Sequence, residues 1–141
     1  TVTKLSWQQI KDLLEARLLL ESAAVELAAA RATSSDIAAL KAAATLPKRK
    51  SLSIEELLDA NLQFHCTIWK ATRNKRLVHM ASEIMDDLMR AMHTAMLSED
   101  TAQMVEHHLQ LTDLIARKKG AEARAAMVEH VDATRQRLLG L

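Results

Sequence analysis

The sequence has few residues that interrupt helices: its 141 residues include two glycines and one proline. Aromatic residues are also scarce, with one phenylalanine, two tryptophans and no tyrosine. Alanine, leucine and methionine are used heavily instead. Strong helix formers with almost no helix breakers are typical of all-α proteins. The composition therefore predicts an all-α fold, an antiparallel bundle of about six helices.

The sequence contains one cysteine, Cys66, which excludes an internal disulfide. It has neither a signal peptide nor an apolar run long enough to cross a membrane, so we expect a cytoplasmic protein with no membrane partner. The formal net charge is only +1, and acidic and basic residues are interleaved along the chain. Because no basic stripe is available for a phosphate backbone, this chain on its own should bind nucleic acid poorly.

Hydrophobic periodicity divides the chain into helical segments with short connections. Capping boxes mark the starts of the first and third segments, where Ser6 is followed by Gln9 and Ser53 by Glu56. The expected helices cover about residues 7–31, 37–46, 53–72, 75–97, 102–119 and 121–139. A chain of this length is of single-domain size, so we expect one all-helical domain over residues 1–141.

Two residues are expected to end helices. The second helix should stop before Pro47, because the residue before a proline disfavours the helical conformation. Gly120 should end the fifth helix, since glycine favours the position that follows the last helical residue.

Two polar residues, Asn61 and His65, lie near the middle of the apolar face of the 53–72 helix. They are four residues apart and therefore share one face of the helix. Burying both costs free energy unless each finds a partner. They form either a hydrogen-bonded pair in the core or part of a ligand-binding site.

A second polar pair, Arg17 and Glu21, falls near the centre of the apolar stripe of the 7–31 helix. One interpretation is an internal ion pair, four residues apart, at the rim of the bundle. The other is that Arg17 binds an anion, because a guanidinium can hold a carboxylate through two parallel hydrogen bonds.

Histidines recur on the inward faces of the last two helices. His107 and His108 both flank the apolar face of the fifth, and periodicity alone does not choose between them. His130 faces inward on the last helix. With His65, the sequence places three inward histidines on three helices. Either a polar core network or a shared metal ion would satisfy them, and imidazole suits Zn²⁺ or Ni²⁺.

Four segments together resemble the effector-binding (FCD) domain of FadR-type GntR transcriptional regulators. They are E-A-R-L-L-L-E at residues 15–21, N-L-Q-F-H at 61–65, E-H-H-L-Q-L-T-D-L-I from Glu106, and A-A-M-V-E-H ending at His130. The spacing of 22 residues between His108 and His130 fits the family, whereas His107 would be one residue out. The resemblance covers nearly the whole chain.

The resemblance implies a divalent metal ion, zinc or alternatively nickel, held by Asn61, His65, His108 and His130. Four protein ligands on an octahedral ion would leave positions open for a small organic acid, and Arg17 would hold the far end of that effector. The family commonly has Asp where this chain has Asn61. The neutral carbonyl oxygen of Asn61 removes a charge from the site, which should lower its affinity for metal.

The resemblance also implies a DNA-binding partner domain and a dimer. The family has a winged helix-turn-helix domain before this one, so we expect the full-length protein to bind DNA through an N-terminal domain absent from this chain. Family members usually form dimers, and exposed methionines of the 75–97 helix suit a homodimer. The expected function is a metal-dependent, carboxylate-sensing domain of a bacterial transcriptional regulator, not an enzyme.

Besides a sensor domain, the sequence allows two other functions, an enzyme or an interaction module. A metal-dependent hydrolase or lyase would use the open metal position to activate water. It is disfavoured because no inward Glu or Asp is expected beside the histidines as a general base; Glu106 and Glu129 adjoin His108 and His130 but point elsewhere. The third possibility is a metal-free helical module for interaction or dimerisation.

Overall fold

The computed structural model describes residues 5–49, 51–96 and 101–140, without the side chains of residues 92–96. These residues form six α-helices and no strand. The helices are α1 (Trp7–Arg31), α2 (Ser34–Arg49), α3 (Ile54–Ala71), α4 (Lys75–Met96), α5 (Thr101–Ala116) and α6 (Gly120–Leu139). The predicted all-α fold is confirmed. The expected end of the fourth helix, Leu97, lies outside the described residues.

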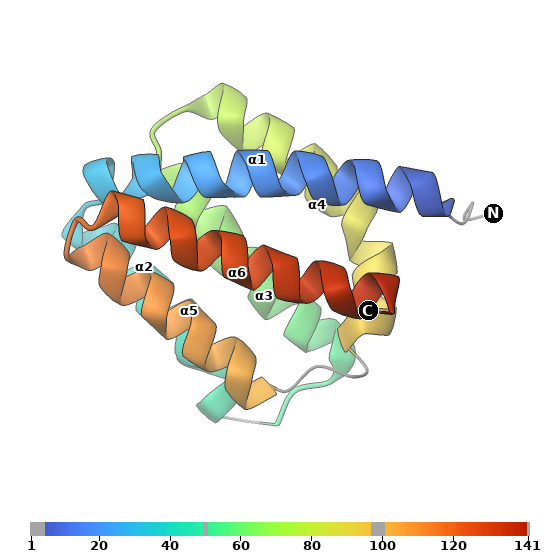
Figure 1. Ribbon diagram of the computed structural model, residues 1–141. Coiled ribbons are helices and arrows are strands. Elements are labelled where there is room, and N and C mark those ends of the chain that lie inside the picture. Colours follow the sequence, from blue (N-terminus) through green and yellow to red (C-terminus); the bar gives the residue numbers. More distant parts are fainter. Residues whose placement is uncertain (1–4, 50, 97–100, 141) are drawn as a thin grey trace.

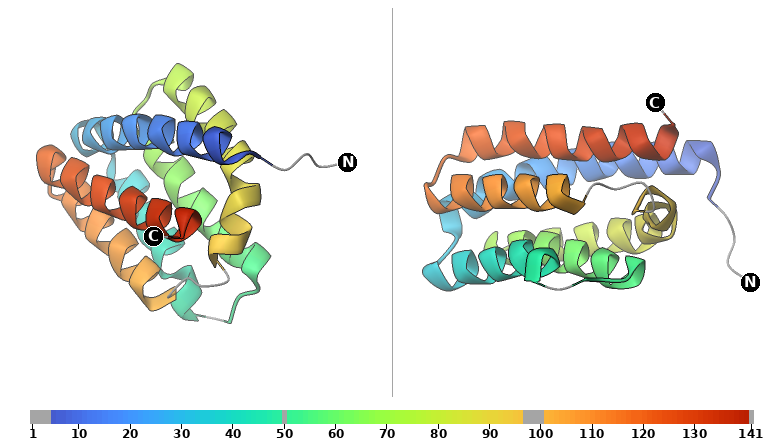
Figure 2. Two further views of the ribbon diagram at one scale, coloured as in Figure 1. Left: turned by 45° about the vertical axis from the view of Figure 1, so that its right-hand side comes forward. Right: turned by 90° about the horizontal axis from the view of Figure 1, so that it is seen from below.

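The helices form two layers (Figures 1 and 2). One layer holds α1, α5 and α6, in which α6 packs against both of the others. The second holds α2, α3 and α4, with α3 in the middle. The layers meet where α1 packs against α3 and α4, and where α5 packs against α2. Side chains that face inward from α1, α3, α5 and α6 therefore share one interior.

Local capping fixes where two of the long helices begin. The Ser6 hydroxyl accepts a hydrogen bond from the Gln9 amide (3.1 Å), and the Gln9 side chain accepts one from the Ser6 amide (2.8 Å). Ser53 and Glu56 make the same reciprocal pair at 3.2 and 3.1 Å. Each box satisfies two backbone donors that a helix start leaves unpaired. Both predicted capping boxes are present.

The predicted end of the second helix was wrong. Helix α2 continues through Pro47 to Arg49. A proline in the last turn removes only its own bond to the carbonyl four residues back, which is a small loss for a helix already anchored. Leu40 and Ala44, both buried, anchor α2 in the core.

The role expected for Gly120 was also wrong, because it begins α6 and does not end α5. Helix α5 stops at Ala116, and Lys118 takes the left-handed conformation (φ 57°) while the Lys119 amide bonds back to the Leu114 carbonyl at 2.9 Å. Gly120 lies in a tight space: a Cβ there would lie 3.3 Å from Cγ of Glu26 and 3.5 Å from its carbonyl oxygen. The glycine allows the start of α6 to approach α1 closely.

Apolar side chains from every helix fill the space between the layers. The largest fully buried ones are Leu14, Leu40, Phe64, Ile68, Trp69, Met85, Leu88, Leu111, Ile115 and Met127. Charged, amide and imidazole side chains are buried in the same interior to 5% exposure or less: Arg17, Glu21, Asn61, His65, His108 and His130. Among the described residues, no helix is both long and apolar enough to span a membrane.

Candidate metal centre

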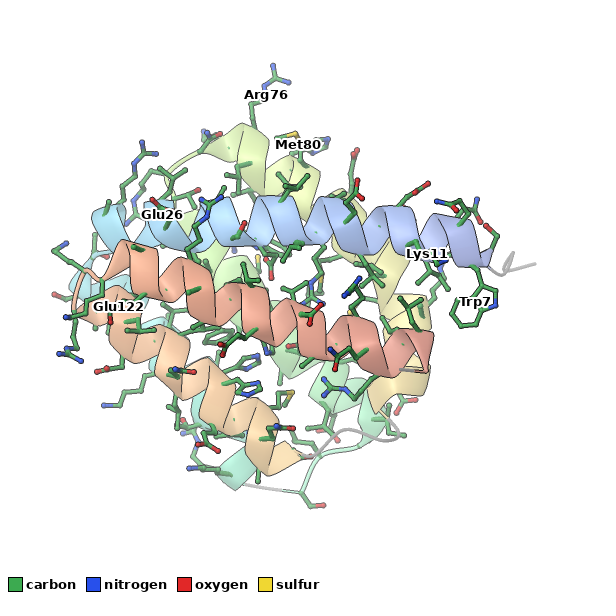
Figure 3. The ribbon with its side chains drawn as sticks, viewed as in Figure 1. Trp7, Lys11, Glu26, Arg76, Met80 and Glu122 are labelled. Atoms are coloured by element: carbon green, nitrogen blue, oxygen red, sulfur yellow. The ribbon has the colours of Figure 1, made fainter. Side chains whose placement is uncertain are left out.

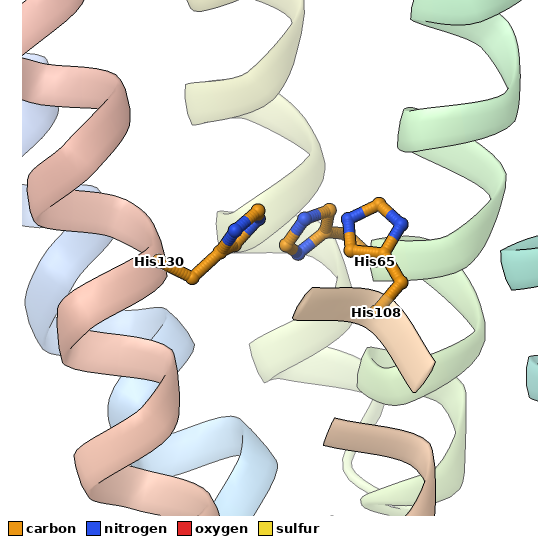
Figure 4. Close-up of side chains that lie close together, drawn as sticks. All are labelled: His65, His108 and His130. Carbon is orange, nitrogen blue, oxygen red and sulfur yellow. The ribbon is translucent and has the colours of Figure 1, made fainter. Parts of the chain in front are cut away.

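Three histidines from three helices meet in the interior (Figure 4). His65 of α3, His108 of α5 and His130 of α6 are 0%, 2% and 5% exposed. Each offers a ring nitrogen, and these atoms all lie within 4.8 Å of one another. The ring centroids are separated by 5.1–5.5 Å. One ion could therefore contact all three side chains.

The Nε2 atom of each of these histidines is buried and has no hydrogen-bond partner in the part of the chain that the structure describes. A buried polar atom without a partner costs about 1–3 kcal/mol, and native interiors contain few of them. Three buried histidines, each offering a ring nitrogen within 4.8 Å of the others, fit a divalent cation, since neutral imidazole nitrogens are good ligands for zinc and nickel. The donor set thus fits a metal ion.

Phe64 supports the ring of His108. Their centroids are 4.0 Å apart and their planes differ by 8°, so the two rings are stacked. Phe64 precedes His65 on α3 and is itself fully buried. The aromatic contact restricts rotation of the His108 imidazole and helps to keep its nitrogens directed into the cluster.

Glu21 of α1 joins this site, which the sequence did not reveal. Its Oε2 lies 2.5 Å from Nδ1 of His65, and its Oε1 accepts a hydrogen bond from the indole nitrogen of Trp69. The carboxylate is only 2% exposed. The expectation that no inward acid stands beside the histidines was therefore wrong. The cause is tertiary: α1 packs directly against α3, a contact that helical periodicity cannot indicate.

Arg17 lies one turn before Glu21, with Nη2 at 3.8 Å from Glu21 Oε2. The predicted i,i+4 ion pair exists, but it lies in the interior and not at the rim, since Arg17 is 1% exposed. A cavity of about 10 Å³ beside the pair is lined by residues of α1, α3 and α4. It is about large enough for one water molecule, so a larger anion at Arg17 requires side chains to move.

Burial and charge set the protonation of the site. Burial alone would raise the pKa of Glu21, but the electrostatic interaction and hydrogen bond with His65, the charge of Arg17 and the hydrogen bond from Trp69 lower the pKa below its usual 4.5. Burial lowers the pKa of His108 well below 6.5, and the charges of His65, Arg17 and His107 lower it further. At neutral pH the carboxylate is ionised and His108 is neutral.

His130 has the same electrostatic character. Burial, followed by the charges of His108, His65, Arg17 and His107, holds the pKa of its imidazole well below 6.5. Neutral imidazoles are the form that binds metal.

Asn61 lies one turn before His65 and is 2% exposed. Its Nδ2 has no hydrogen-bond partner among the described residues. The sequence pattern that put Asn61 and His65 on one buried face is thus reproduced. The side chain supplies an amide group on the face of α3 that carries His65.

His107 lies outside the three-histidine group but touches it. The Nδ1 atoms of His107 and His130 are 3.4 Å apart, and His107 is half-buried. The structure thus separates the two neighbours that periodicity left open: His108 is in the cluster, whereas His107 contacts the outer nitrogen of His130. Glu106 and Glu129 are exposed, as expected.

A cleft lies elsewhere on the described surface. It has a volume of about 510 Å³ and runs between α1 and α6. Its walls include Lys11, Leu18, Val131 and Arg135, but none of the three histidines. The histidine cluster is therefore enclosed and does not line this cleft.

The chain belongs to the FCD domain family, whose model matches residues 12–133. The predicted family, the effector-binding domain of FadR-type GntR regulators, is confirmed. Metal binding is a known property of FCD domains. The fold is similar to that of Escherichia coli McbR/YncC, which superimposes over 99% of this chain and 68% of its own with a TM-score of 0.81, at 20% identity.

Curated relatives are regulators of transcription. The Uxu operon regulator of Haemophilus influenzae is 29% identical over 92% of this chain. The Uxu operon transcriptional regulator of Escherichia coli is 30% identical over 91%, and the HTH-type transcriptional regulator LutR of Bacillus subtilis 29% identical over 88%. The chain spans 51%, 53% and 59% of those proteins. These relatives are named as regulators, which agrees with the expected regulatory domain and gives no support to the hydrolase or lyase alternative.

Proposed function

We propose that this domain senses a small organic acid with the help of a bound divalent metal ion, zinc or alternatively nickel. The observation that carries the proposal is the set of three buried Nε2 atoms, on His65, His108 and His130, that have no partner within the described residues. A metal-free polar core would be expected to pair these atoms with one another or with neighbouring groups. The closeness of the three histidines, each with a ring nitrogen within 4.8 Å of the others, supports an ion as the missing partner.

The ligands would be the three imidazoles and the Oδ1 atom of Asn61. When bound, the metal supplies a positive centre with open positions for the oxygen atoms of a carboxylate. Arg17 would bind the other end of the acid, because its guanidinium can donate two parallel hydrogen bonds to a carboxylate. In the structure Arg17 faces Glu21, so the acid would compete with Glu21 for it.

Effector binding would alter the activity of a longer regulator. We infer that the full-length protein carries an N-terminal winged helix-turn-helix domain and that DNA is a partner only through it. The names of the relatives support this inference, since LutR is an HTH-type transcriptional regulator. An acid that binds one arrangement of the bundle better than another would shift the equilibrium by that difference in affinity.

The metal is tested first, by elemental mass spectrometry on untagged protein purified without chelator. Zinc or nickel should be present at about one ion per chain, because one set of histidine ligands holds one ion. His65→Ala should lose it, and His79→Ala should keep it, because the His79 side chain is 72% exposed. Metal-free wild-type protein, even after incubation with zinc and nickel, would overturn the proposal.

The effector class is tested by thermal shift with mono-, di- and tricarboxylates, on zinc-loaded and zinc-free protein. Acids should raise the melting temperature of the loaded protein much more than that of the free protein, because the metal supplies part of their site. The corresponding primary amides are the matched controls and should have no effect. Equal shifts with acids and amides would contradict carboxylate recognition.

We also infer a homodimer. Met80 of α4 is 46% exposed and points outward (Figure 3), and exposed methionine suits a partner surface. Sedimentation velocity should give a dimer for the wild type and a monomer for Met80→Glu. Val128→Glu is the control, since Val128 is similarly exposed (39%) but lies on α6. A monomeric wild type would refute the inference.

A further inference from the structure

We propose that Glu21 is the positioning residue for His65: its carboxylate accepts the Nδ1 proton and so holds the imidazole with Nε2 bare and directed at His108 and His130. The inference rests on the proposed metal site, and it assigns a role to a residue outside the expected ligand set. Glu21 would not touch the metal. It would act through the ring of His65.

The first step is the contact itself. Glu21 Oε2 lies 2.5 Å from His65 Nδ1, a distance at which two atoms without a shared proton would repel each other. An ionised carboxylate can only accept hydrogen bonds, so the proton belongs to Nδ1. In a neutral imidazole the other nitrogen then carries a lone pair. That nitrogen, Nε2, is buried and has no hydrogen-bond partner among the described residues, whereas Nδ1 has the Glu21 carboxylate at 2.5 Å.

The second step is that Glu21 is itself held in place. The indole nitrogen of Trp69 donates to Oε1, and Arg17 lies 3.8 Å from Oε2. Trp69 and Arg17 are each 1% exposed, so both partners are fixed by packing. A carboxylate with both oxygens engaged has little freedom to rotate. It can therefore impose an orientation on His65, which a mobile surface acid could not do.

The third step concerns charge. With Asn61 in place of an aspartate, none of the four expected ligands is charged. Arg17 adds a positive charge near the cluster, which opposes a cation. The Glu21 carboxylate offsets this charge from behind His65, and a carboxylate on the far nitrogen of a ligating histidine makes that imidazole a stronger ligand. Glu21 thus compensates in part for the missing charge at position 61.

Two variants on α1 separate this role from a general loss of charge. Glu21→Gln preserves the shape of the side chain, removes its charge, and allows the amide to present a donor to His65. Glu15→Gln makes the same change at an exposed position of the same helix and serves as the matched control. Zinc affinity is measured for each protein by competition with a chromogenic chelator. Glu21→Gln should bind zinc about 10–100-fold more weakly, and Glu15→Gln should match the wild type.

A second readout does not depend on metal. In ¹⁵N–¹H spectra of zinc-free protein, the His65 ring of the wild type should be the Nδ1-protonated tautomer, and Glu21→Gln should lose this preference. Wild-type zinc affinity and an unchanged tautomer in folded Glu21→Gln would overturn the inference and leave the metal site standing. If the wild type binds no zinc, the proposed function fails, and the tautomer spectrum alone decides whether Glu21 orients His65.

Should Glu21→Gln fail to fold, Trp69→Phe replaces it. This change removes the indole donor that holds Oε1 and keeps an aromatic ring in the core, although the smaller phenyl group also loses some packing. The less constrained carboxylate should weaken zinc binding several-fold and broaden the tautomer preference of His65. Zinc affinity and spectra identical to those of the wild type would again overturn the inference.

Discussion

The rings of Phe64 and His108 are stacked, with centroids 4.0 Å apart and planes 8° from parallel. The contact joins α3 to α5, which lie in different layers of the bundle (Figure 2). Helix α3 therefore contributes twice at neighbouring positions: His65 enters the cluster, and Phe64 supports the histidine that comes from α5. A ligand position on one helix is thus maintained by a side chain on another.

Phe64→Leu should lower both the stability of the domain and its affinity for zinc. The change leaves a partly empty space beside His108 and removes the aromatic contact, for about 1–3 kcal/mol of unfolding free energy. Urea denaturation of zinc-free protein and zinc titration measure the two effects. The control is Leu40→Ala on α2, which should reduce stability and leave zinc affinity unchanged. If Phe64→Leu also leaves zinc affinity unchanged, the stacked contact does not contribute to the metal site.

His108→Ala should abolish metal binding, whereas His107→Ala should retain it. Only His108 belongs to the group of three buried rings, while His107 reaches Nδ1 of His130 from outside. Metal content of the two purified variants decides the matter. Equal loss in both would contradict the assigned register of α5.

Arg17→Ala should keep the metal and lose affinity for carboxylates by at least about tenfold, the value of a charge-assisted hydrogen-bonded pair. Titration calorimetry with the most strongly binding acid, on zinc-loaded protein, provides the measurement. Arg17→Lys keeps the positive charge but loses the planar guanidinium. Its affinity for the acid should therefore lie between those of the wild type and Arg17→Ala. Unchanged acid affinity in Arg17→Ala would remove Arg17 from the effector site.

Asn61→Asp should have opposite effects on the two forms of the protein. Without metal, a charged side chain is buried and stability should fall by about 1–3 kcal/mol. With zinc, the added charge should strengthen binding by at least about tenfold, because carboxylate is a better ligand than amide. Urea denaturation of the zinc-free variant measures the change in stability, and zinc titration measures the change in affinity. Weaker zinc binding would mean that the residue at position 61 does not reach the ion.

The zinc-free domain should lose stability as the pH falls below about 6.5. Folded His108 and His130 have pKa values well below 6.5, whereas the unfolded chain takes up their protons near that value. Between the two values the unfolded state binds more protons, so lower pH favours unfolding, with a slope of up to about one proton for each group. Urea midpoints at pH 7.5, 6.5 and 5.5 measure this slope.

Exposed and buried histidines give contrasting controls for the pH effect. His79→Gln should leave the slope unchanged because the His79 side chain is 72% exposed. His130→Gln should make it shallower by removing one of the two groups. Midpoints that stay constant from pH 7.5 to 5.5 in the wild type would show that these imidazoles are not held neutral by the fold.

Helix boundaries that depend on residues close in sequence were predicted correctly. The capping boxes at Ser6 and Ser53 each involve residues three apart, so the sequence alone contains the whole interaction. The end of α2 at Arg49 depends instead on tertiary burial of Leu40 and Ala44, which outweighs the local effect of Pro47. Gly120 likewise could not be assigned from its neighbours, because its constraint comes from Glu26 on another helix.

The same distinction applies to the site. Helical periodicity placed Asn61, His65 and His130 on inward faces, since each lies within an apolar stripe of its own helix. It could not place Glu21 against His65, because that contact depends on how α1 packs on α3. Even so, an acid near the centre of an apolar stripe was a signal that it has a buried partner beyond Arg17.

The three histidines lie on helices from both layers, with His65 in one layer and His108 and His130 in the other (Figures 2 and 4). An ion held by all three would be a removable cross-link between segments distant in sequence. It would stabilise the folded state by about 4 kcal/mol at a free concentration a thousand times its dissociation constant. Cys66, the single thiol, has no partner for such a link within the chain. Rigidity of the bundle would then follow the supply of metal, so a chelator would act on this domain as a reductant acts on a disulfide-bonded one.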